Sequence, residues 1–304
     1  MTQYDYLKLG ASLYVPATRS DMLAIANNEK LPQLKSVIFC LEDSVLESNM
    51  PVALGNIGVM LKALVPTPSK LRFIRVRDVG VLRQCLELEG IEQIDGFVLP
   101  KVTLASFKEF VAVLPTDSEY KLMPTLETRE ALDMTEMSAL RDFILTENLL
   151  PRILSLRIGG NDLLNLFGLR RSTTRTMYDS PLRLIISQLV ACFRPYGFNL
   201  TSPVCELLYD REILNAEVCL DLEHGLFGKT AVHPDQIALI EEHYRVGADE
   251  VETAREILSV SAAAVFQRNG RMCEPATHRN WAEALIARAE IYGVHGERRL
   301  AVAA

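Results

Sequence analysis

Paired cysteines, long apolar runs and an excess of basic charge are all missing from this sequence of 304 residues. None of its six Cys residues forms a C-x-x-C pair, and most lie in apolar runs, which is typical of reduced, buried thiols. The segment Met1–Gly10 has no apolar signal core, and no run reaches the ~18 apolar residues that a membrane span needs. We therefore expect a cytoplasmic protein that binds no membrane.

The charge balance and the missing motifs exclude further classes of function. With 32 basic and 39 acidic residues the net charge is −7, so the chain is a poor candidate for binding nucleic acid, although a few Arg side chains can still hold small anions. No Gly-rich dinucleotide motif or P-loop follows the first apolar run, and G-x-S-x-G is absent. A composition of 49% hydrophobic and 23% charged residues predicts a globular protein with a large core.

The sequence does contain a regular alternation of short apolar runs and amphipathic helical stretches. The strand-like runs are 12–16, 36–42, 71–77, 95–101, 121–127, 153–159, 198–204 and 228–234. Helical stretches follow them at 20–28, from 51, 79–88, from 104, from 129, near 179–194, 210–224 and 235–243. Eight β/α units predict an α/β protein with a (β/α)8 TIM barrel over residues 1–245, and a doubly wound open sheet is the alternative.

Residues 246–304 fall outside the barrel count. Helical stretches near 249–267 and 279–292 are separated by Asn269-Gly270, which favours a break. We expect this segment to form a C-terminal helical extension that covers the barrel mouth or contacts a neighbouring subunit.

Polar and charged side chains gather where the predicted strands end. They are Glu42, Asp43, Arg75, Arg77, Lys101 and Glu127, followed by Gly159-Gly160-Asn161-Asp162. In a (β/α)8 barrel the carboxyl ends of all strands meet at one face, where active sites form. The sequence therefore predicts that these residues surround a common mouth.

Glu127 and Asp162 stand on adjacent strand ends, an arrangement that suits a hard divalent cation. Magnesium takes one or two carboxylates and leaves the rest of its shell to water and substrate oxygens. The alternative is that each carboxylate caps the helix that follows it, or pairs with Arg or Lys. The spacing alone leaves both interpretations open.

The cationic residues of the mouth are open to two interpretations as well. Arg75 and Arg77 share a strand face, from which they can hold a carboxylate or polarise a carbonyl, or pair with Glu42 or Asp43. Lys101 could hold an anion or form a salt bridge. The basic loop 169–175 could meet phosphates or be a solvated surface loop.

Taken together, these motifs resemble the family of the citrate lyase beta subunit and the malyl-CoA and citramalyl-CoA lyases, within the magnesium-dependent aldolase superfamily. The matching segments, in order along the chain, are Leu13–Ala17, Phe39–Val45, Arg75–Arg77, Leu99–Lys101, Leu126–Thr128, Gly159–Leu163 and Gly228–Gln236. The tail after Pro275 is more similar to a divergent C–C bond lyase branch. The sequence departs from the family at Arg77, where Asn is usual, and at Glu274, where Asp is usual.

The resemblance implies roles for these residues. Glu127 and Asp162 would hold Mg²⁺, which Mn²⁺ could replace. Arg75 would contact the substrate carbonyl or carboxylate. From the residues and the resemblance together, we predict a catalytic set of Arg75, Glu42, Asp43, Lys101 and Glu274, and a substrate-binding set of Arg75, Arg77, Gly160 and Asn161. The resemblance also implies a homo-oligomer, often a trimer, in which Glu274 reaches a neighbour's site.

The predicted function is a Mg²⁺-dependent C–C bond lyase that acts on a 3-hydroxy acid or its CoA thioester through a metal-stabilised enolate. The same site could run aldol or Claisen cleavage or condensation, and CoA as a substrate handle stays open because Glu274 departs from the family pattern. The alternative is a citrate lyase-like barrel with weak or no chemistry that serves as a binding or assembly subunit.

Overall fold

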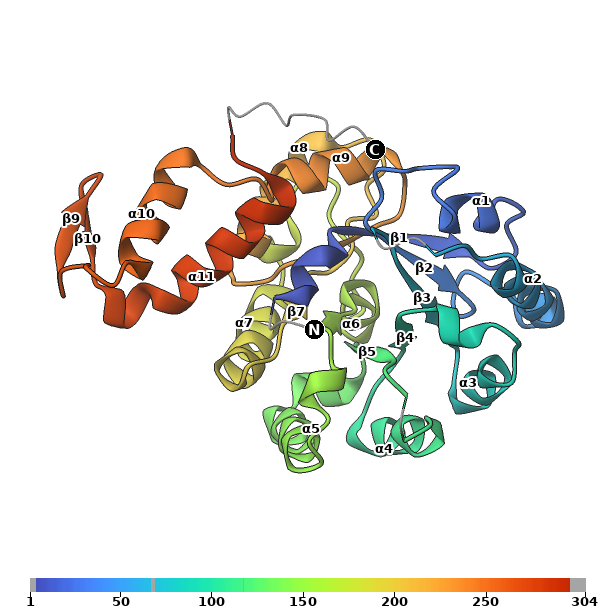
Figure 1. The fold of residues 1–304 in the computed structure, drawn as a ribbon. Coiled ribbons are helices and arrows are strands. Elements are labelled where there is room, and N and C mark those ends of the chain that lie inside the picture. Colours follow the sequence, from blue (N-terminus) through green and yellow to red (C-terminus); the bar gives the residue numbers. More distant parts are fainter. Residues whose placement is uncertain (1–3, 67–68, 117, 296–304) are drawn as a thin grey trace.

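The chain forms a ring of eight parallel strands surrounded by helices (Figure 1). The structure is a computed structural model that describes residues 4–66, 69–116 and 118–295. The strands are β1 Ala11–Pro16, β2 Ser36–Cys40, β3 Leu71–Arg75, β4 Gly96–Leu99, β5 Lys121–Leu126, β6 Leu156–Ile158, β7 Leu200–Thr201 and β8 Lys229–Ala231. Their order is β7-β6-β5-β4-β3-β2-β1-β8, and a parallel bridge between Ser202 and Lys229 brings β7 against β8. The ring confirms the TIM-barrel prediction over an open sheet.

Helices cover the outside of the ring, as the alternating sequence pattern predicts. They are α1 Met22–Ala26, α2 Met50–Lys62, α3 Val79–Leu86, α4 Leu104–Val113, α5 Met134–Thr146, α6 Gly160–Leu166, α7 Leu182–Phe193, α8 Arg211–Glu223 and α9 Asp235–Glu242. Side-chain caps fix several of their starts: Asp78, for example, accepts a hydrogen bond from the Val81 N–H at the start of α3. The short helix α6 was not predicted, and it directly follows β6.

Apolar side chains on both faces of the strands build the core. All five residues of β2 are buried, and Phe39, Phe73 and Phe97 on three neighbouring strands are 0% exposed. Such doubly buried strands are typical of parallel sheets, because helices cover their outer face. The rigid ring fixes the loops that carry the polar strand ends.

The C-terminal segment contains a hairpin as well as helices. Its elements are α10 Ala248–Leu258, β9 Phe266–Arg268, β10 Arg271–Cys273 and α11 Pro275–Tyr292. The predicted helix over 249–267 is therefore wrong beyond Leu258. Asn269 and Gly270 both have positive φ, 50° and 75°, and this left-handed pair turns the chain between two antiparallel strands.

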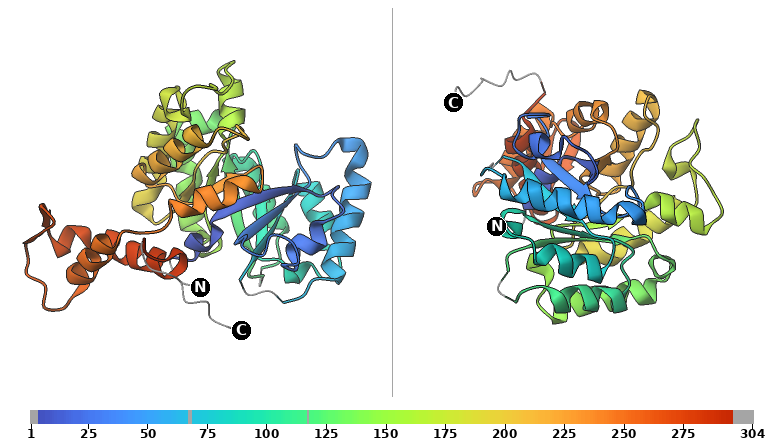
Figure 2. Two further views of the ribbon diagram at one scale, coloured as in Figure 1. Left: turned by 90° about the horizontal axis from the view of Figure 1, so that it is seen from above. Right: turned by 90° about the vertical axis from the view of Figure 1, so that its right-hand side faces the viewer.

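The C-terminal segment projects to one side of the barrel (Figures 1 and 2). A small hydrophobic cluster of its own joins α10 and α11, with Val251, Ile257 and Leu285 among its buried members. The far end of α11 returns to the barrel, where the Tyr292 hydroxyl donates to the Leu7 carbonyl at 2.6 Å. The boundary at residue 245 stays a prediction.

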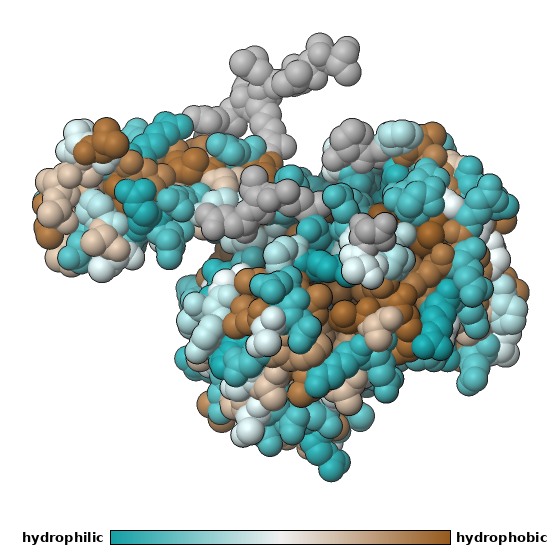
Figure 3. Space-filling view, turned by 60° about the horizontal axis from the view of Figure 1, so that its bottom comes forward, coloured by the Kyte–Doolittle hydropathy of each residue, from teal (hydrophilic) through white to brown (hydrophobic). Residues whose placement is uncertain are grey.

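Apolar surface is visible on both the barrel and the projecting segment (Figure 3). Exposed large side chains of the projecting segment include Val260, Val265, Met272 and Trp281. Exposed apolar side chains of this kind are compatible with a subunit interface. The homo-oligomer itself stays a prediction. Among the described residues, no helix combines the length and apolar character needed to cross a bilayer.

Candidate functional site

A cavity of about 400 Å³ opens at the carboxyl ends of the strands. Its lining comes from six of the eight strands and from turns that follow strands: Tyr14, Pro16, Cys40, Asp43, Ser44, Arg75, Thr125, Glu127, Arg157, Ile158, Gly159, Gly160, Asn161, Asp162, Val204, Thr230 and Val232. The structure thus brings together Asp43, Arg75, Glu127 and Asp162, as the sequence predicted. This is the face on which TIM-barrel enzymes build their active sites.

Glu127 lies at the end of β5 and is only 4% exposed. Its Oε1 accepts a hydrogen bond of 2.8 Å from the backbone N–H of Lys101 and lies 3.7 Å from Arg75 Nη2. Lys101 has a φ of 48°, an uncommon value for a side-chain-bearing residue, which belongs to the tight turn after β4. Gly159 lies against Glu127 so closely that any Cβ there would overlap the carboxylate.

Burial raises the pKa of Glu127 to about 7, and the nearby carboxylate of Asp162 adds to the increase, while Arg75 and the Lys101 N–H oppose it. The repulsion identifies Asp162 as an electrostatic neighbour of Glu127. Asp162 is half-buried in the first turn of α6 and lines the same cavity. A buried carboxylate whose pKa is raised in part by a second carboxylate beside it forms a site that favours a cation.

A second acidic pair surrounds Arg75. Its Nη2 lies 2.6 Å from Glu42 Oε2 and 3.5 Å from Asp43 Oδ2, and Lys101 Nζ lies 2.6 Å from Glu42 Oε1 and 3.3 Å from Asp43 Oδ1. These partners overcome the effect of burial and raise the pKa of Lys101, so its side chain is a stable ammonium. Arg75 therefore fits both interpretations of its role: it forms an ion pair with Glu42, and it also lines the cavity, where it can contact a substrate.

Arg77 has a different position from the one its spacing suggested. The strand β3 ends at Arg75, and the Arg77 guanidinium donates to the carbonyls of Leu41, Glu42 and Val45, at 3.4, 3.3 and 2.5 Å. These contacts stabilise the loop after β2, which carries Asp43. The geometry therefore does not support Arg77 as a direct substrate ligand.

Gly160 and Asn161 form the N-terminal end of α6. Gly160 is packed so tightly that a Cβ would lie 2.7 Å from the Cβ of Pro203 and 2.8 Å from the Sδ of Met177. The Asn161 amide donates to Glu206 Oε2 at 2.6 Å. Tight packing at Gly160 and this hydrogen bond fix the turn that presents Asp162 to the cavity.

Beneath this turn lies a buried group of charges that sequence reasoning did not identify. Arg171 pairs with Glu217, and Lys229 Nζ lies 3.4 Å from Glu217 and 2.9 Å from Asp221. All four side chains are 5% exposed or less. We call these four residues the buried quartet.

The buried quartet attaches the loop after α6 to α8. Glu217 accepts from the Met177 N–H at 2.8 Å, and Arg171 Nη2 donates to the Val204 carbonyl at 2.6 Å. Within the basic loop, Arg170 and Arg175 are exposed whereas Arg171 is buried. The interpretation of this loop as wholly solvated is therefore wrong, because Arg171 is an internal anchor.

Arg157, in the middle of β6, was also missed. It is 4% exposed and lines the cavity. A charged residue inside the apolar run 153–159 was the available signal, because an Arg side chain is rarely buried unless a partner compensates its charge.

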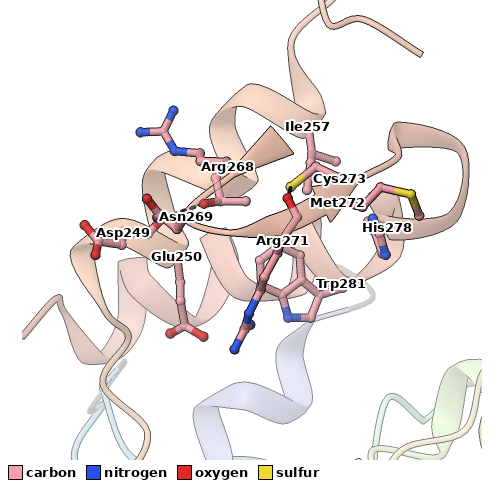
Figure 4. Close-up of a pocket in the computed structure, with 11 residues that line it drawn as sticks. Asp249, Glu250, Ile257, Arg268, Asn269, Arg271, Met272, Cys273, His278 and Trp281 are labelled. Carbon is pink, nitrogen blue, oxygen red and sulfur yellow. Dashed lines mark hydrogen bonds between the residues drawn. The ribbon is translucent and has the colours of Figure 1, made fainter. Parts of the chain in front are cut away.

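Glu274 lies outside the barrel cavity of its own chain. It follows β10 in the C-terminal segment, where Thr277 Oγ1 donates to its Oε2 at 3.2 Å. A second cavity of about 550 Å³ lies in this segment, where Glu250, Arg271 and Trp281 extend on the same side (Figure 4). No barrel strand end contributes to it, so we place the candidate active site at the barrel mouth.

The donor chemistry of the barrel mouth is that of a hard-cation site. Within residues 4–66, 69–116 and 118–295, no group of three or more His, Cys, Asp or Glu side chains forms a complete metal cage. A site for Mg²⁺ does not require one, because this ion uses one or two carboxylates and retains water or substrate oxygens. Glu127 and Asp162 supply that number.

Acidic residues around the mouth of a TIM barrel are the arrangement of a TIM-barrel enzyme that binds a divalent cation. Comparison with known proteins identifies its family. Residues 3–294 match the family described as C-C_Bond_Lyase of the TIM-Barrel fold. The chain belongs to this family of carbon–carbon lyases, of the citrate lyase and malyl-CoA lyase type.

Characterised relatives lie at moderate identity. A (3S)-malyl-CoA thioesterase of Cereibacter sphaeroides is 28% identical over 264 residues, covering 85% of this chain and 84% of the relative. An L-malyl-CoA/beta-methylmalyl-CoA lyase of Rhodobacter capsulatus is 26% identical over 285 residues, covering 83% and 86%. Both similarities extend over most of the barrel.

Solved structures share the fold. CitE of Mycobacterium tuberculosis, in complex with magnesium, acetoacetate and coenzyme A, aligns with a TM-score of 0.67 at 23% identity, covering 93% of this chain and 100% of that one. A citrate lyase of Burkholderia xenovorans aligns with a TM-score of 0.72 at 17% identity, covering 94% and 92%. At these identities the likeness shows the fold alone.

Proposed function

We propose that this protein is a Mg²⁺-dependent lyase that breaks or forms a C–C bond in a 3-hydroxy acid or its CoA thioester. One observation carries the proposal: Glu127 and Asp162 line a single cavity together with the guanidinium of Arg75. The names of the relatives support it, since one is a malyl-CoA lyase and one structure contains magnesium and coenzyme A.

The residues present fit Mg²⁺. Burial raises the pKa of Glu127 to about 7, which means that the cavity disfavours the ionised carboxylate. A bound cation would stabilise that carboxylate, and Asp162 is the second donor. When bound there, Mg²⁺ supplies Lewis-acid stabilisation of the charge that develops on a substrate carbonyl oxygen, and Mn²⁺ has the same preference for oxygen ligands.

Arg75 is the residue that would orient the substrate. Its Nη2 is held by Glu42, while its buried Nε–H has no hydrogen-bond partner among the residues that the structure describes. That N–H can donate to a substrate carbonyl or carboxylate oxygen as negative charge grows on it. Because its position is fixed in advance, little reorganisation accompanies the reaction.

Glu42 and Lys101 would act by holding Arg75 and Asp43 in place. Lys101 is an ammonium bound to two carboxylates, which argues against a role as an amine nucleophile. Asp43 has a lowered pKa, because Glu42, Arg75 and Lys101 together outweigh its burial, so it is an ionised group at the cavity wall. We propose that Asp43 accepts the hydroxyl proton at its carboxylate, with Glu274 of a neighbouring copy as the second candidate.

A second candidate function is thioester hydrolysis. The relatives named (3S)-malyl-CoA thioesterase favour it. A site that positions a malyl thioester beside a cation could serve either reaction. The binding or assembly subunit is favoured by no specific contact, since the departure at Arg77 concerns a loop and not the cavity.

The decisive experiment follows the fate of a malyl or citramalyl thioester with and without Mg²⁺. A lyase releases an oxo acid together with acyl-CoA, whereas a thioesterase releases free CoA and the hydroxy acid. Metal-dependent exchange of the methyl protons of pyruvate in D₂O reports enolate formation without any CoA. If neither thioesters nor free oxo acids show a metal-dependent reaction, the lyase proposal is wrong.

The affinity for Mg²⁺ is expected to fall as the pH drops. Because the pKa of Glu127 is raised to about 7, protons compete with the cation below that pH. The Kd measured by titration calorimetry should rise about tenfold between pH 8 and pH 6. In Glu127→Gln the residual affinity should lack this dependence. An unchanged Kd in the native protein would contradict the proposed role.

A further inference from the structure

A buried cation without an anionic partner lies inside the barrel. Arg157 is 4% exposed, and its guanidinium donates to Thr230 Oγ1, contacts the sulfur of Met123 at 3.8 Å and lies 5.6 Å from the ring centre of Tyr14. Among the described residues, no carboxylate forms an ion pair with it. A hydroxyl, a thioether and an aromatic face are all neutral groups.

The contrast with Arg75 shows what Arg157 lacks. Both guanidinium groups contact the ring of Tyr14, at 5.3 and 5.6 Å from its centre. Arg75 has Glu42 at 2.6 Å, whereas Arg157 has no such anion in the described part of the chain. Burying an uncompensated charge is unfavourable, so charged groups inside proteins are normally paired. A buried arginine without an anionic partner indicates that a negatively charged group of a bound ligand supplies the counterion.

The position of Arg157 relative to Glu127 defines where this anion would lie. Arg157 pairs with Thr125 in the β5–β6 register, and Glu127 follows Thr125 by two residues, directly after the end of β5, and lines the same cavity. The two levels are therefore separated by about 6.5 Å along the strand. All three residues line the same cavity, with Arg157 at the deeper level.

Hydroxyl groups complete the deeper level. Thr230, which contacts Arg157, is 1% exposed, and Thr125 is 4% exposed. The Thr125 hydroxyl is buried with no hydrogen-bond partner within the residues the structure describes. A guanidinium and an unpaired hydroxyl facing the same space are donors that suit a carboxylate.

We propose that Arg157, with Thr125 and Thr230, binds a second carboxylate of the substrate. The inference rests on the proposed function, in which Arg75 and the cation at Glu127 and Asp162 hold the other end of the substrate acid. The substrate class is then a short acid with two carboxylates, a hydroxy or oxo diacid, rather than a monocarboxylate. Arg157 selects the substrate and takes no part in proton transfer.

The test compares two pairs of stable ligands that differ by one carboxylate. Binding of each enantiomer of malate and of lactate is measured by calorimetry in the presence of Mg²⁺. We expect the better enantiomer of malate to bind at least tenfold more tightly than the better enantiomer of lactate. The variant Arg157→Met should lose this preference and change lactate affinity less than twofold.

Two controls separate ligand binding from a structural role. Without ligand, Arg157→Met should melt at the same temperature as the native protein or higher, because an unpaired buried charge has been removed. Arg157→Lys should retain part of the preference, and Arg170→Met, on the exposed loop, all of it. Equal losses for malate and lactate in Arg157→Met, or a lowered melting temperature, would overturn the inference.

The outcomes also distinguish this inference from the proposed function. If lactate binds with Mg²⁺ and malate binds no more tightly, the diacid inference is wrong and the metal site stands. If neither acid binds to the native protein in the presence of Mg²⁺, the diacid inference is wrong, whereas the proposed function fails only if the thioester and oxo-acid assays also show no metal-dependent reaction.

Discussion

Replacing Glu127 with Gln should lower kcat/KM for the metal-dependent reaction by roughly 10³-fold while making the metal-free protein more stable at pH 8. The loss of activity follows from removing the more deeply buried of two carboxylates that would hold the cation. The amide oxygen can still accept the Lys101 N–H, so the turn after β4 should be retained.

The stability gain follows from the pKa of Glu127. Burial raises it from 4.5 to about 7 in the folded protein, so ionisation destabilises the fold as the pH rises through this range. Above pH 7 the difference amounts to up to about 3 kcal/mol, which an uncharged Gln avoids. Thermal unfolding of both proteins at pH 5 and pH 8, with and without Mg²⁺, measures it. A metal-free variant that is less stable at pH 8 would contradict this account.

Replacing Arg171 with Met should destabilise the protein by about 3 kcal/mol, because it leaves the buried carboxylate of Glu217 with Lys229 as its remaining close cation. For a chain of this size the melting temperature should fall by about 6–10 °C. The exposed neighbour gives a matched control, since Arg170→Met should shift it by less than about 1 °C.

The double variant Arg171→Met with Glu217→Gln tests the reason for this loss. Removing both charges should recover part of the stability, because the unpaired carboxylate is then gone. A double variant that is destabilised by the sum of two independent losses would show that packing, and not charge pairing, holds the loop in place.

The barrel could be predicted because its signals are local. Apolar runs bounded by polar residues identify buried parallel strands. The rule that the carboxyl ends of such strands share one face is then enough to place Arg75, Glu127 and Asp162 around a single mouth. The detailed geometry of the site could not be predicted. The hydrogen bond from the Lys101 N–H to Glu127, for example, depends on the positive φ of Lys101, which the sequence does not reveal.

Other features could not be predicted because their partners lie far apart in sequence. No residue near Glu217 in the sequence indicates that it pairs with Arg171. The spacing between Asp221 and Lys229 likewise does not predict their ion pair. Arg77 was misplaced because β3 ends two residues before it. The hairpin over 266–273 had a local signal in Asn269-Gly270, but the flanking strands are only three residues each.

The most direct test of the central claim is the anomalous diffraction of crystals soaked in Mn²⁺ at pH 8. The account predicts one strong peak at the barrel mouth, within coordination distance of carboxylate oxygens of both Glu127 and Asp162, and its loss in Glu127→Gln. A peak bound by other side chains, or none in the cavity at saturating metal, would contradict it.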